Sequence, residues 1–171
     1  MASVERPRVS IRERALERAI PPGALLALDA SATLAYLGGN EVASPAATWV
    51  FDAAIATGRN PAILSAVTAA EILVRPFRAG AESVGVVEGF LRFFGLRIVD
   101  ATYAITREAA RIRAATGLSM PDAIVIGSAT DQGAAIVVTN DRAWPRSLAR
   151  AGIRPRILQL EDFVRATSPS G

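Results

Sequence analysis

The sequence predicts a three-layer α/β/α sandwich around a central, mainly parallel sheet of four to five strands. Short apolar segments alternate with longer segments of helical character along the 171 residues. The apolar segments show no alternation of apolar and polar residues, which is typical of strands buried on both faces. Hydrophobic residues make up 51% of the chain and its mean hydropathy is +0.30, so one such core can be filled.

The strands are the short, uniformly apolar segments, and the helices between them end at glycine or proline. Strands are expected at 25–28, 62–66, 97–99, 135–138 and 156–158. Helices are expected at 31–37, 45–57, 68–75, 81–94, 104–116 and 121–131. We expect Pro76 to stop the third of these helices, because proline cannot donate the hydrogen bond that continues a helix.

Three regions are predicted from composition. Residues 1–23 form an Arg-rich N-terminal extension with a short charged helix at 11–20, which must dock or fray because isolated helices of this length are marginal. Residues 24–164 form the α/β domain, and residues 165–171 a polar C-terminal tail.

The composition excludes several kinds of chemistry. The chain has no Cys, no His and no Lys, so all 19 basic residues are Arg. Catalytic triads with His, thiol nucleophiles, Cys or His zinc sites and Schiff-base lysines are therefore excluded. If the protein is an enzyme, its chemistry depends on carboxylates. The net charge of +3 permits a polyanionic partner without requiring one.

No segment predicts export or a membrane span. The longest stretches without a charge are 11 residues, at 30–40 and 60–70, and a span needs about 20. A cytoplasmic protein is expected.

Four acids occupy positions where apolar or small residues are the rule. Asp29 follows the first predicted strand directly, and Asp141 follows AIVVTN at the carboxyl end of the fourth. Glu71 lies just after the second strand, and Asp122 begins a helix. Because the carboxyl ends of parallel strands share one edge of the sheet, we expect all four side chains at that edge.

Each acid also has a purely structural interpretation. Residues 68–71 read as a capping box, residues 119–122 nearly so, and Asp141 suits a turn. Asp29 is harder to explain in this way, because it ends a buried strand with no Arg within ten residues on either side. The remaining acids, including Glu161, are interpreted as ordinary surface.

Converging carboxylates repel one another and would partly stay protonated at neutral pH. A divalent cation removes this repulsion, and an all-oxygen site selects Mg²⁺ or Mn²⁺. The natural substrate is a phosphodiester, because the metal activates water and neutralises the charge on phosphate.

The segments LLALDASATLAYL, SAVTAAEILV, TGLSMPDAIVIGSA and IVVTNDRAW carry these acids. In this order they resemble the PIN-domain ribonucleases, most of all the VapC-type toxins of type II toxin–antitoxin pairs. The resemblance covers residues 24–164, and it implies a PIN-like nuclease domain that holds Mg²⁺ or Mn²⁺ and cleaves single-stranded RNA.

The resemblance carries the metal site over to Asp29, Glu71, Asp122 and Asp141. Asp29, Glu71 and Asp122 match the first three acidic motifs. The fourth motif reads 139–141 here, and Asp141 binds the metal either directly or through water. The resemblance gives Ser31, Thr139 and Asn140 supporting roles, although a helix N-cap for Ser31 and a strand end for Thr139 are equally ordinary.

The resemblance also implies partners. Arg75, Arg113 and Arg142 lie near the acids and are candidates for RNA phosphate contacts, or else ordinary surface arginines. A homodimer is implied, as is an antitoxin that closes the acidic pocket with an Arg. The aromatic residues that could line a groove for an antitoxin helix are more often core: Trp49, Phe51, Phe90, Phe93 and Phe94.

Alternatives stay open at this point. The 23 residues before the first strand depart from the family, and either a misassigned start or an Arg-rich RNA or partner contact explains them. The chain could be a non-catalytic RNA-binding or regulatory module, or an RNA processing or decay nuclease without an antitoxin. A phosphatase is disfavoured, because Asp29 has no second Asp two residues on and there is no Lys.

Overall fold

The computed structural model describes residues 9–166. A five-stranded sheet forms its centre, with every neighbouring pair of strands parallel, which confirms the predicted fold class. In spatial order the strands are β4 (Arg97–Val99), β3 (Ala62–Ser65), β2 (Leu26–Leu28), β5 (Ile136–Thr139) and β6 (Arg156–Gln159).

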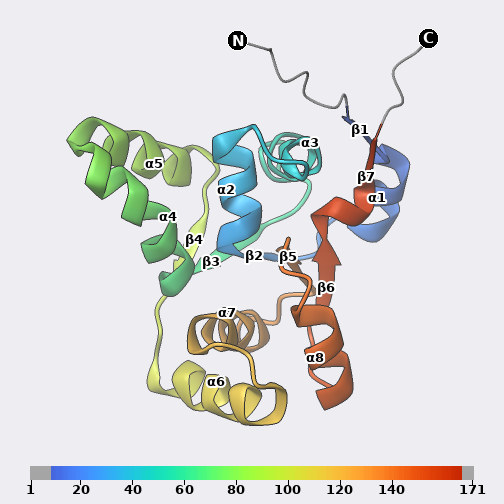
Figure 1. Ribbon diagram of the computed structural model, residues 1–171, viewed down its shortest axis with the longest axis vertical. Coiled ribbons are helices and arrows are strands. Elements are labelled where there is room, and N and C mark those ends of the chain that lie inside the picture. The colour runs from blue at the N-terminus through green and yellow to red at the C-terminus, as the bar shows by residue number, and fades with distance from the viewer. Residues whose placement is uncertain (1–8, 167–171) are drawn as a thin grey trace, which may run out of the picture.

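Helices cover both faces of the sheet (Figure 1). On one face lie α2 (Ala30–Gly38), α3 (Ser44–Thr48), the π-helix η1 (Trp49–Ile55), α4 (Ala66–Ala79) and α5 (Ala81–Phe93). On the other lie α6 (Tyr103–Thr116), α7 (Met120–Asp131) and α8 (Trp144–Ala151).

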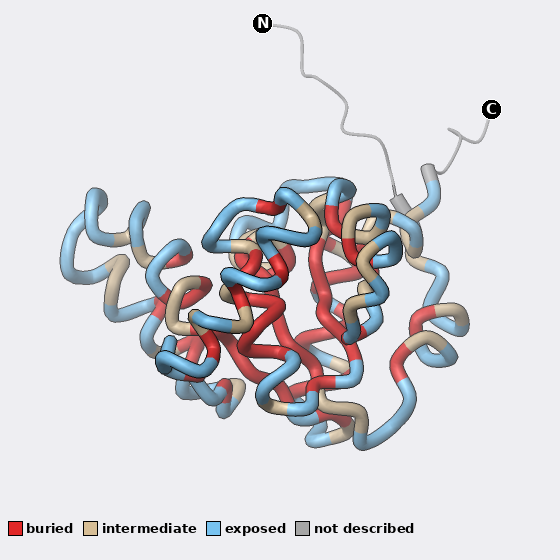
Figure 2. Tube along the Cα trace, turned by 90° about the horizontal axis from the view of Figure 1, so that it is seen from below, coloured by how far each residue is buried: buried red, intermediate tan, exposed pale blue. Residues whose placement is uncertain are grey.

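The three central strands, β2, β3 and β5, are buried at every position because a separate hydrophobic core lies on each face of the sheet. Leu26 and Leu28 pack into the α2–α5 core, whereas Ala27 between them packs into the α6–α8 core. This is the period of two that a pleated strand imposes. Figure 2 shows these strands as a buried band through the middle of the molecule.

The start and end of the described chain lie against each other. β1 (Val9–Ile11) pairs antiparallel with β7 (Val164–Ala166), and α1 (Glu13–Ala19) follows β1. The 3₁₀-helix η2 (Leu160–Phe163) joins β6 to β7.

The division into three regions stays a prediction, to which the structure adds contacts. Leu16 and Ile20 of the predicted extension are fully buried in the same core as β2. Residues 1–8 of that extension and 167–171 of the predicted tail lie outside the described residues.

Three expectations about elements differ from the structure. Pro76 does not end its helix: α4 runs on to Ala79 and packs against α5, and the turn at Gly80, with φ of 120°, ends it. The predicted helix 45–57 is a short α-helix followed by a π-helix. The sequence interpretation also missed α8, although Trp144 and Leu148 bury one side of it.

The strand order places one particular edge of the sheet in position for a site. The chain proceeds from β2 to β3 and β4 on one side, then returns to place β5 and β6 on the other. Ligands in such sheets bind at the carboxyl ends of the strands where the order reverses, here between β2 and β5. Within residues 9–166, no helix has the length and apolar character needed to cross a membrane.

Candidate functional site

Asp29 lies at the reversal point, directly after β2, where it is also the N-cap of α2. It is only 6% exposed. Its Oδ2 accepts three hydrogen bonds, from the Ser31 amide (3.2 Å), Ser31 Oγ (2.6 Å) and Thr139 Oγ1 (2.9 Å). Every hydrogen bond that a described side chain or amide gives this carboxylate ends on Oδ2, so Oδ1 is the oxygen left for a cation.

Ser31 and Thr139 join the two strands that flank the reversal point. Ser31 Oγ accepts from the Asn140 amide at 2.8 Å, and Thr139 Oγ1 accepts from the Asp141 amide at 3.0 Å. Each hydroxyl therefore orients Asp29 and fixes the chain after β5 at the same time. The interpretation of Ser31 as an N-cap is wrong, because Asp29 holds that position.

Glu71 lies on α4, one strand further along the edge. The predicted capping box at 68–71 is wrong, because Ser65 is the N-cap and its Oγ accepts from the Thr68 amide at 3.0 Å. Glu71 therefore lies in the second turn with an exposed side chain. Partial desolvation, then the charges of Asp29 and Asp122, raise its pKa above the ordinary 4.5.

Asp122 lies in the first turn of α7, where the structure bears out the cap-like interpretation. Ser119 Oγ accepts from the Asp122 amide at 3.2 Å and donates to Asp122 Oδ2 at 2.6 Å. Burial raises the pKa of Asp122 above the ordinary 3.8; the Ser119 hydroxyl opposes this, and the charges of Asp29 and Asp141 add to it.

Asp141 lies in the turn between β5 and α8 and is half-buried. Its Oδ1 accepts from the Ala143 amide at 2.8 Å, so the turn interpretation also holds. Its charge nevertheless reaches Asp122.

The four predicted acids are therefore coupled through their charges at one edge of the sheet. Within residues 9–166, however, no three acidic side chains lie in an arrangement ready to hold a metal ion. Two of the acids instead form local hydrogen bonds, Asp122 with Ser119 and Asp141 with the Ala143 amide of its own turn. The available ligands are carboxylate oxygens, and the Asp29 carboxylate is oriented by Ser31 and Thr139. Such a set of ligands fits a hard divalent cation.

Glu161 belongs to this edge, although the sequence interpretation assigned it to ordinary surface. Its carboxylate accepts from Asn140 Nδ2 at 2.9 Å and from Arg142 at 3.0 Å. Gln159 Nε2 donates to the carbonyl of Asp141. The end of β6 therefore holds the turn that carries Asp141. The signal was available, since Glu161 follows a predicted strand just as Asp29 and Asp141 do.

The three arginines suggested as phosphate contacts differ in their surroundings. Arg142 forms ion pairs with Glu161 (3.0 Å) and Asp162 (3.4 Å), so it is engaged as the site stands. Arg113 donates to the Leu118 carbonyl at 3.2 Å, before the Asp122 helix. Arg75 is exposed on α4, and no ion pair joins it to another described residue.

The aromatic residues are mainly core. Trp49, Phe51 and Phe90 are buried, and Phe94 is half-buried against them. Phe93 is the exception, with 77% of its surface exposed.

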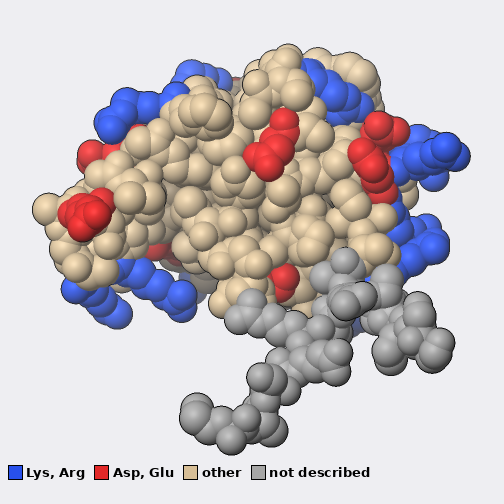
Figure 3. Space-filling model, turned by 90° about the horizontal axis from the view of Figure 1, so that it is seen from above, with Lys and Arg blue, Asp and Glu red and all other residues tan. Residues whose placement is uncertain are grey.

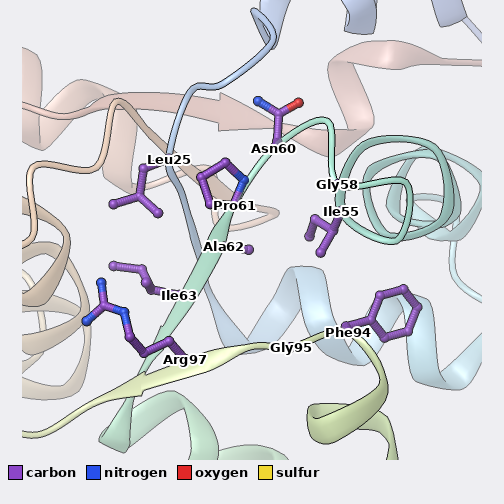
Figure 4. A pocket seen from close by; sticks show the side chains of 10 residues that line it. All are labelled: Leu25, Ile55, Gly58, Asn60, Pro61, Ala62, Ile63, Phe94, Gly95 and Arg97. Atoms are coloured by element: carbon purple, nitrogen blue, oxygen red, sulfur yellow. The ribbon is translucent and has the colours of Figure 1, made fainter.

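A hollow of about 440 Å³ lies at the opposite, amino end of the strands (Figure 4). Leu25, Ile63 and Phe94 supply an apolar lining, with Arg97 at one side. None of the described residues that line it carries a carboxylate. It therefore lacks the chemistry of the sheet edge that carries Asp29, Glu71, Asp122 and Asp141, which we call the acidic edge.

Comparison with known proteins identifies a family for most of the chain. The PIN domain family model matches residues 26–148. No curated protein matches the sequence.

Several solved structures have similar folds. One is a toxin–antitoxin complex from Klebsiella pneumoniae: 18% identity and a TM-score of 0.60, over 79% of this chain and 97% of that one. Another is VapBC2 from Rickettsia felis, bound to a promoter DNA fragment. It has 16% sequence identity and a TM-score of 0.61, over 79% of this chain and 97% of that one. A third is VapC20 from Mycobacterium tuberculosis, a toxin that cleaves the sarcin–ricin loop. It has 14% sequence identity and a TM-score of 0.57, over 76% of this chain and 97% of that one.

Proposed function

The chain belongs to the PIN domain family, and from this premise we propose that it is a metal-dependent endoribonuclease that cleaves single-stranded regions of RNA. The observation that carries the proposal is the charge coupling among Asp29, Glu71, Asp122 and Asp141. The charges of Asp29 and Asp122 help to raise the pKa of Glu71, and those of Asp29 and Asp141 help to raise the pKa of Asp122. Among the described residues, no arginine forms an ion pair with any of the four acids. A divalent cation would neutralise these charges.

Asp29, Glu71 and Asp122 would hold Mg²⁺ or Mn²⁺, with Asp141 contributing directly or through water. When bound, the cation supplies charge neutralisation at the scissile phosphate and activation of a water molecule. Ser31 and Thr139 orient the Asp29 carboxylate by donating to Oδ2. Asn140 joins the fourth acidic turn to Glu161, which fixes where Asp141 lies.

Arginines around the edge would bind the RNA backbone. Arg75 and Arg113 are exposed near Glu71 and Asp122, and Arg142 would become available if phosphate replaced its acidic partners. Contacts to phosphate position RNA without specifying its sequence. Exposed single-stranded loops are the usual targets of sequence-specific recognition in RNA.

We also propose that the protein is a homodimeric, cytoplasmic toxin neutralised by a cognate antitoxin. Support comes from the similar folds in a toxin–antitoxin complex from Klebsiella pneumoniae and in VapBC2 from Rickettsia felis. An antitoxin guanidinium among the four carboxylates would compete with the metal, because both satisfy the same charges.

The experiment is cleavage of a panel of total RNA and tRNA by pure protein with Mg²⁺, Mn²⁺ or EDTA. The Asp29→Asn variant is prepared identically, because amide for carboxylate keeps the shape and removes the charge. Discrete fragments that require metal and vanish in the variant are expected. Identical patterns from both proteins would mean contamination. RNA binding without cleavage by either would favour the non-catalytic module.

A further inference from the structure

We propose that the pocket between α1 and the β1–β7 ribbon is a second RNA-binding site, which holds the phosphate backbone of the substrate beside the acidic edge. This inference rests on the proposed RNA substrate. The pocket has a volume of about 360 Å³, and Arg12, Arg14, Arg18 and Arg165 line it. Among the described residues of the lining, Glu13 is the only acid.

The local structure explains why these side chains gather. Leu16 and Ile20 anchor α1 in the core, so positions 14 and 18, two residues from each, lie on the opposite, exposed face. In the ribbon, Arg165 pairs directly with Ser10, and both line the pocket. Figure 3 shows Arg side chains gathered at the right-hand end of the molecule, where α1 lies in Figure 1.

The pocket is electrostatically unbalanced. Among the described residues, ion pairs engage Arg111 and Arg142 but none of the four pocket arginines. The whole chain has a net charge of only +3, so four guanidiniums around one glutamate concentrate positive charge locally. Guanidinium groups bind phosphate oxygens with two parallel hydrogen bonds, and a polyanion would relieve the repulsion among them.

The position of the pocket favours RNA as the ligand. Arg165 comes four residues after Glu161, which accepts the hydrogen bond from Asn140 beside Asp141. The backbone positions of Glu161 and Arg165 are therefore at most about 14 Å apart. An RNA strand bound at the acidic edge can reach the pocket across this distance. The Arg12 amide donates to the Phe163 carbonyl at 2.8 Å, which ties α1 to this end of the site.

The family likeness does not account for the pocket, because its residues lie outside the matched region 26–148. The pocket is a feature of the flanking segments of this chain. It would bind the backbone of any RNA sequence that the acidic edge accepts.

The test is binding of a fluorescein-labelled oligouridylate to the full chain in EDTA, followed by fluorescence anisotropy over a range of salt concentrations. The pocket variant is Arg14→Gln/Arg18→Gln/Arg165→Gln. The matched control, Arg107→Gln/Arg146→Gln/Arg150→Gln, removes the same charge from exposed positions on α6 and α8. All six side chains are exposed, so both variants should fold, which circular dichroism checks.

The pocket variant is expected to bind more weakly, and its slope of log Kd against log salt should fall by about 2, since each lost single-strand phosphate contact removes about 0.7. The control should keep the wild-type slope. Equal losses in the two variants would overturn the inference, because net charge alone would then explain binding. Competition by a polyglutamate peptide as strong as by RNA of equal charge would also overturn it, in favour of an acidic protein partner.

Cleavage, measured separately, distinguishes the two proposals. A wild-type protein that cleaves RNA while the pocket variant keeps its salt slope would refute the pocket alone. A protein that never cleaves but loses its slope in the pocket variant would refute the nuclease and leave the binding site standing.

Discussion

At the scale of single residues, the site depends on hydrogen bonds that leave one carboxylate oxygen free. The hydroxyls of Ser31 and Thr139 donate hydrogen bonds to Asp29 Oδ2. The same two hydroxyls accept hydrogen bonds from the backbone amides of Asn140 and Asp141, respectively. The two strand ends are thereby fixed to each other. Asp29 is the acid that the sequence singles out most clearly, because a charge that ends a buried apolar strand has few structural explanations.

The raised pKa values of Glu71 and Asp122 predict how stability depends on pH without metal. Because the folded state binds these protons more tightly, their contribution to stability is fully present below a pH of about 4 and is lost as pH rises through the raised folded-state values. In EDTA, Glu71→Gln/Asp122→Asn should therefore gain free energy of unfolding relative to wild type between pH 4 and pH 7. Urea unfolding at several pH values measures this.

The control for the pH experiment is Glu82→Gln/Glu88→Gln, which removes two exposed acids from α5. Its free energy of unfolding should change with pH in the same way as that of the wild type. A Glu71/Asp122 variant that also ran parallel would mean that the acids do not repel one another in the folded protein.

Glu161 should matter for cleavage more than for stability. Its ion pair with Arg142 is partly exposed, at 62% for Arg142 and 32% for Glu161, and such pairs contribute about 0–1 kcal/mol. Glu161→Ala, however, frees Asn140 and the turn that carries Asp141. We expect a lower kcat with an unfolding free energy within about 1 kcal/mol of wild type.

Glu161→Gln provides the comparison for this effect, because its amide oxygen still accepts from Asn140 while the charge opposite Arg142 is lost. Its kcat should lie between those of wild type and the alanine variant. Hydrogen exchange at residues 140–142 adds a structural readout. Unchanged exchange and kcat in Glu161→Ala would show that β6 does not position the turn.

At the scale of elements, the parallel sheet was predictable and its surroundings less so. Apolar runs mark β2, β3 and β5, whereas β4 and β6 each begin with an arginine and give a weaker signal. The continuation of α4 through Pro76 was not visible, because tertiary packing against α5 outweighs a local preference of about 3 kcal/mol. The β1–β7 ribbon joins opposite ends of the chain through three residue pairs, too short and too distant in sequence to give a pattern.

The helix α1 should contribute substantially to stability. Leu16 is fully buried, so Leu16→Ala is expected to cost about 2–5 kcal/mol by leaving a cavity. Urea unfolding measures it, and Glu17→Ala, at the next and exposed position, should stay within about 0.5 kcal/mol of wild type. Equal unfolding midpoints for Leu16→Ala and wild type would mean that α1 is an appendage that does not support the core.

At the scale of the whole molecule, the α4–α5 hairpin presents apolar side chains to solvent. Phe77 and Phe93 are 69% and 77% exposed, and Val74 and Val86 are 47% and 64% exposed. Figure 2 shows the exposed outer end of this hairpin projecting from the buried sheet. Large exposed apolar groups on one element are typical of protein interfaces.

The homodimer proposal therefore predicts that Phe77→Ser/Phe93→Ser reduces self-association, measured by sedimentation equilibrium. The control is Tyr103→Ser, which removes an aromatic side chain that is 83% exposed on α6. Loss of the dimer in the hairpin variant alone is expected. A wild-type protein that sediments as a monomer at every concentration would refute the homodimer.

The sequence predicts that four acids lie at one sheet edge, and their role as metal ligands stays a proposal; the geometry of that edge could not be predicted. Sequence order places Asp29, Glu71, Asp122 and Asp141 at one edge. It does not show that Ser65 rather than Thr68 caps α4, or that Glu161 reaches across from β6. Those details depend on side-chain distances between segments far apart in the chain.

The most direct test of the central claim is calorimetric titration of Mn²⁺ into the wild type and into Asp29→Asn, Glu71→Gln, Asp122→Asn and Asp141→Asn, with Glu82→Gln as control. If the four carboxylates converge on one cation, the wild type and control bind Mn²⁺ alike. Asp29→Asn, Glu71→Gln and Asp122→Asn should each weaken that same binding, and Asp141→Asn should weaken it less if its contact is through water. Wild-type affinity in the Asp29, Glu71 and Asp122 variants would contradict the account.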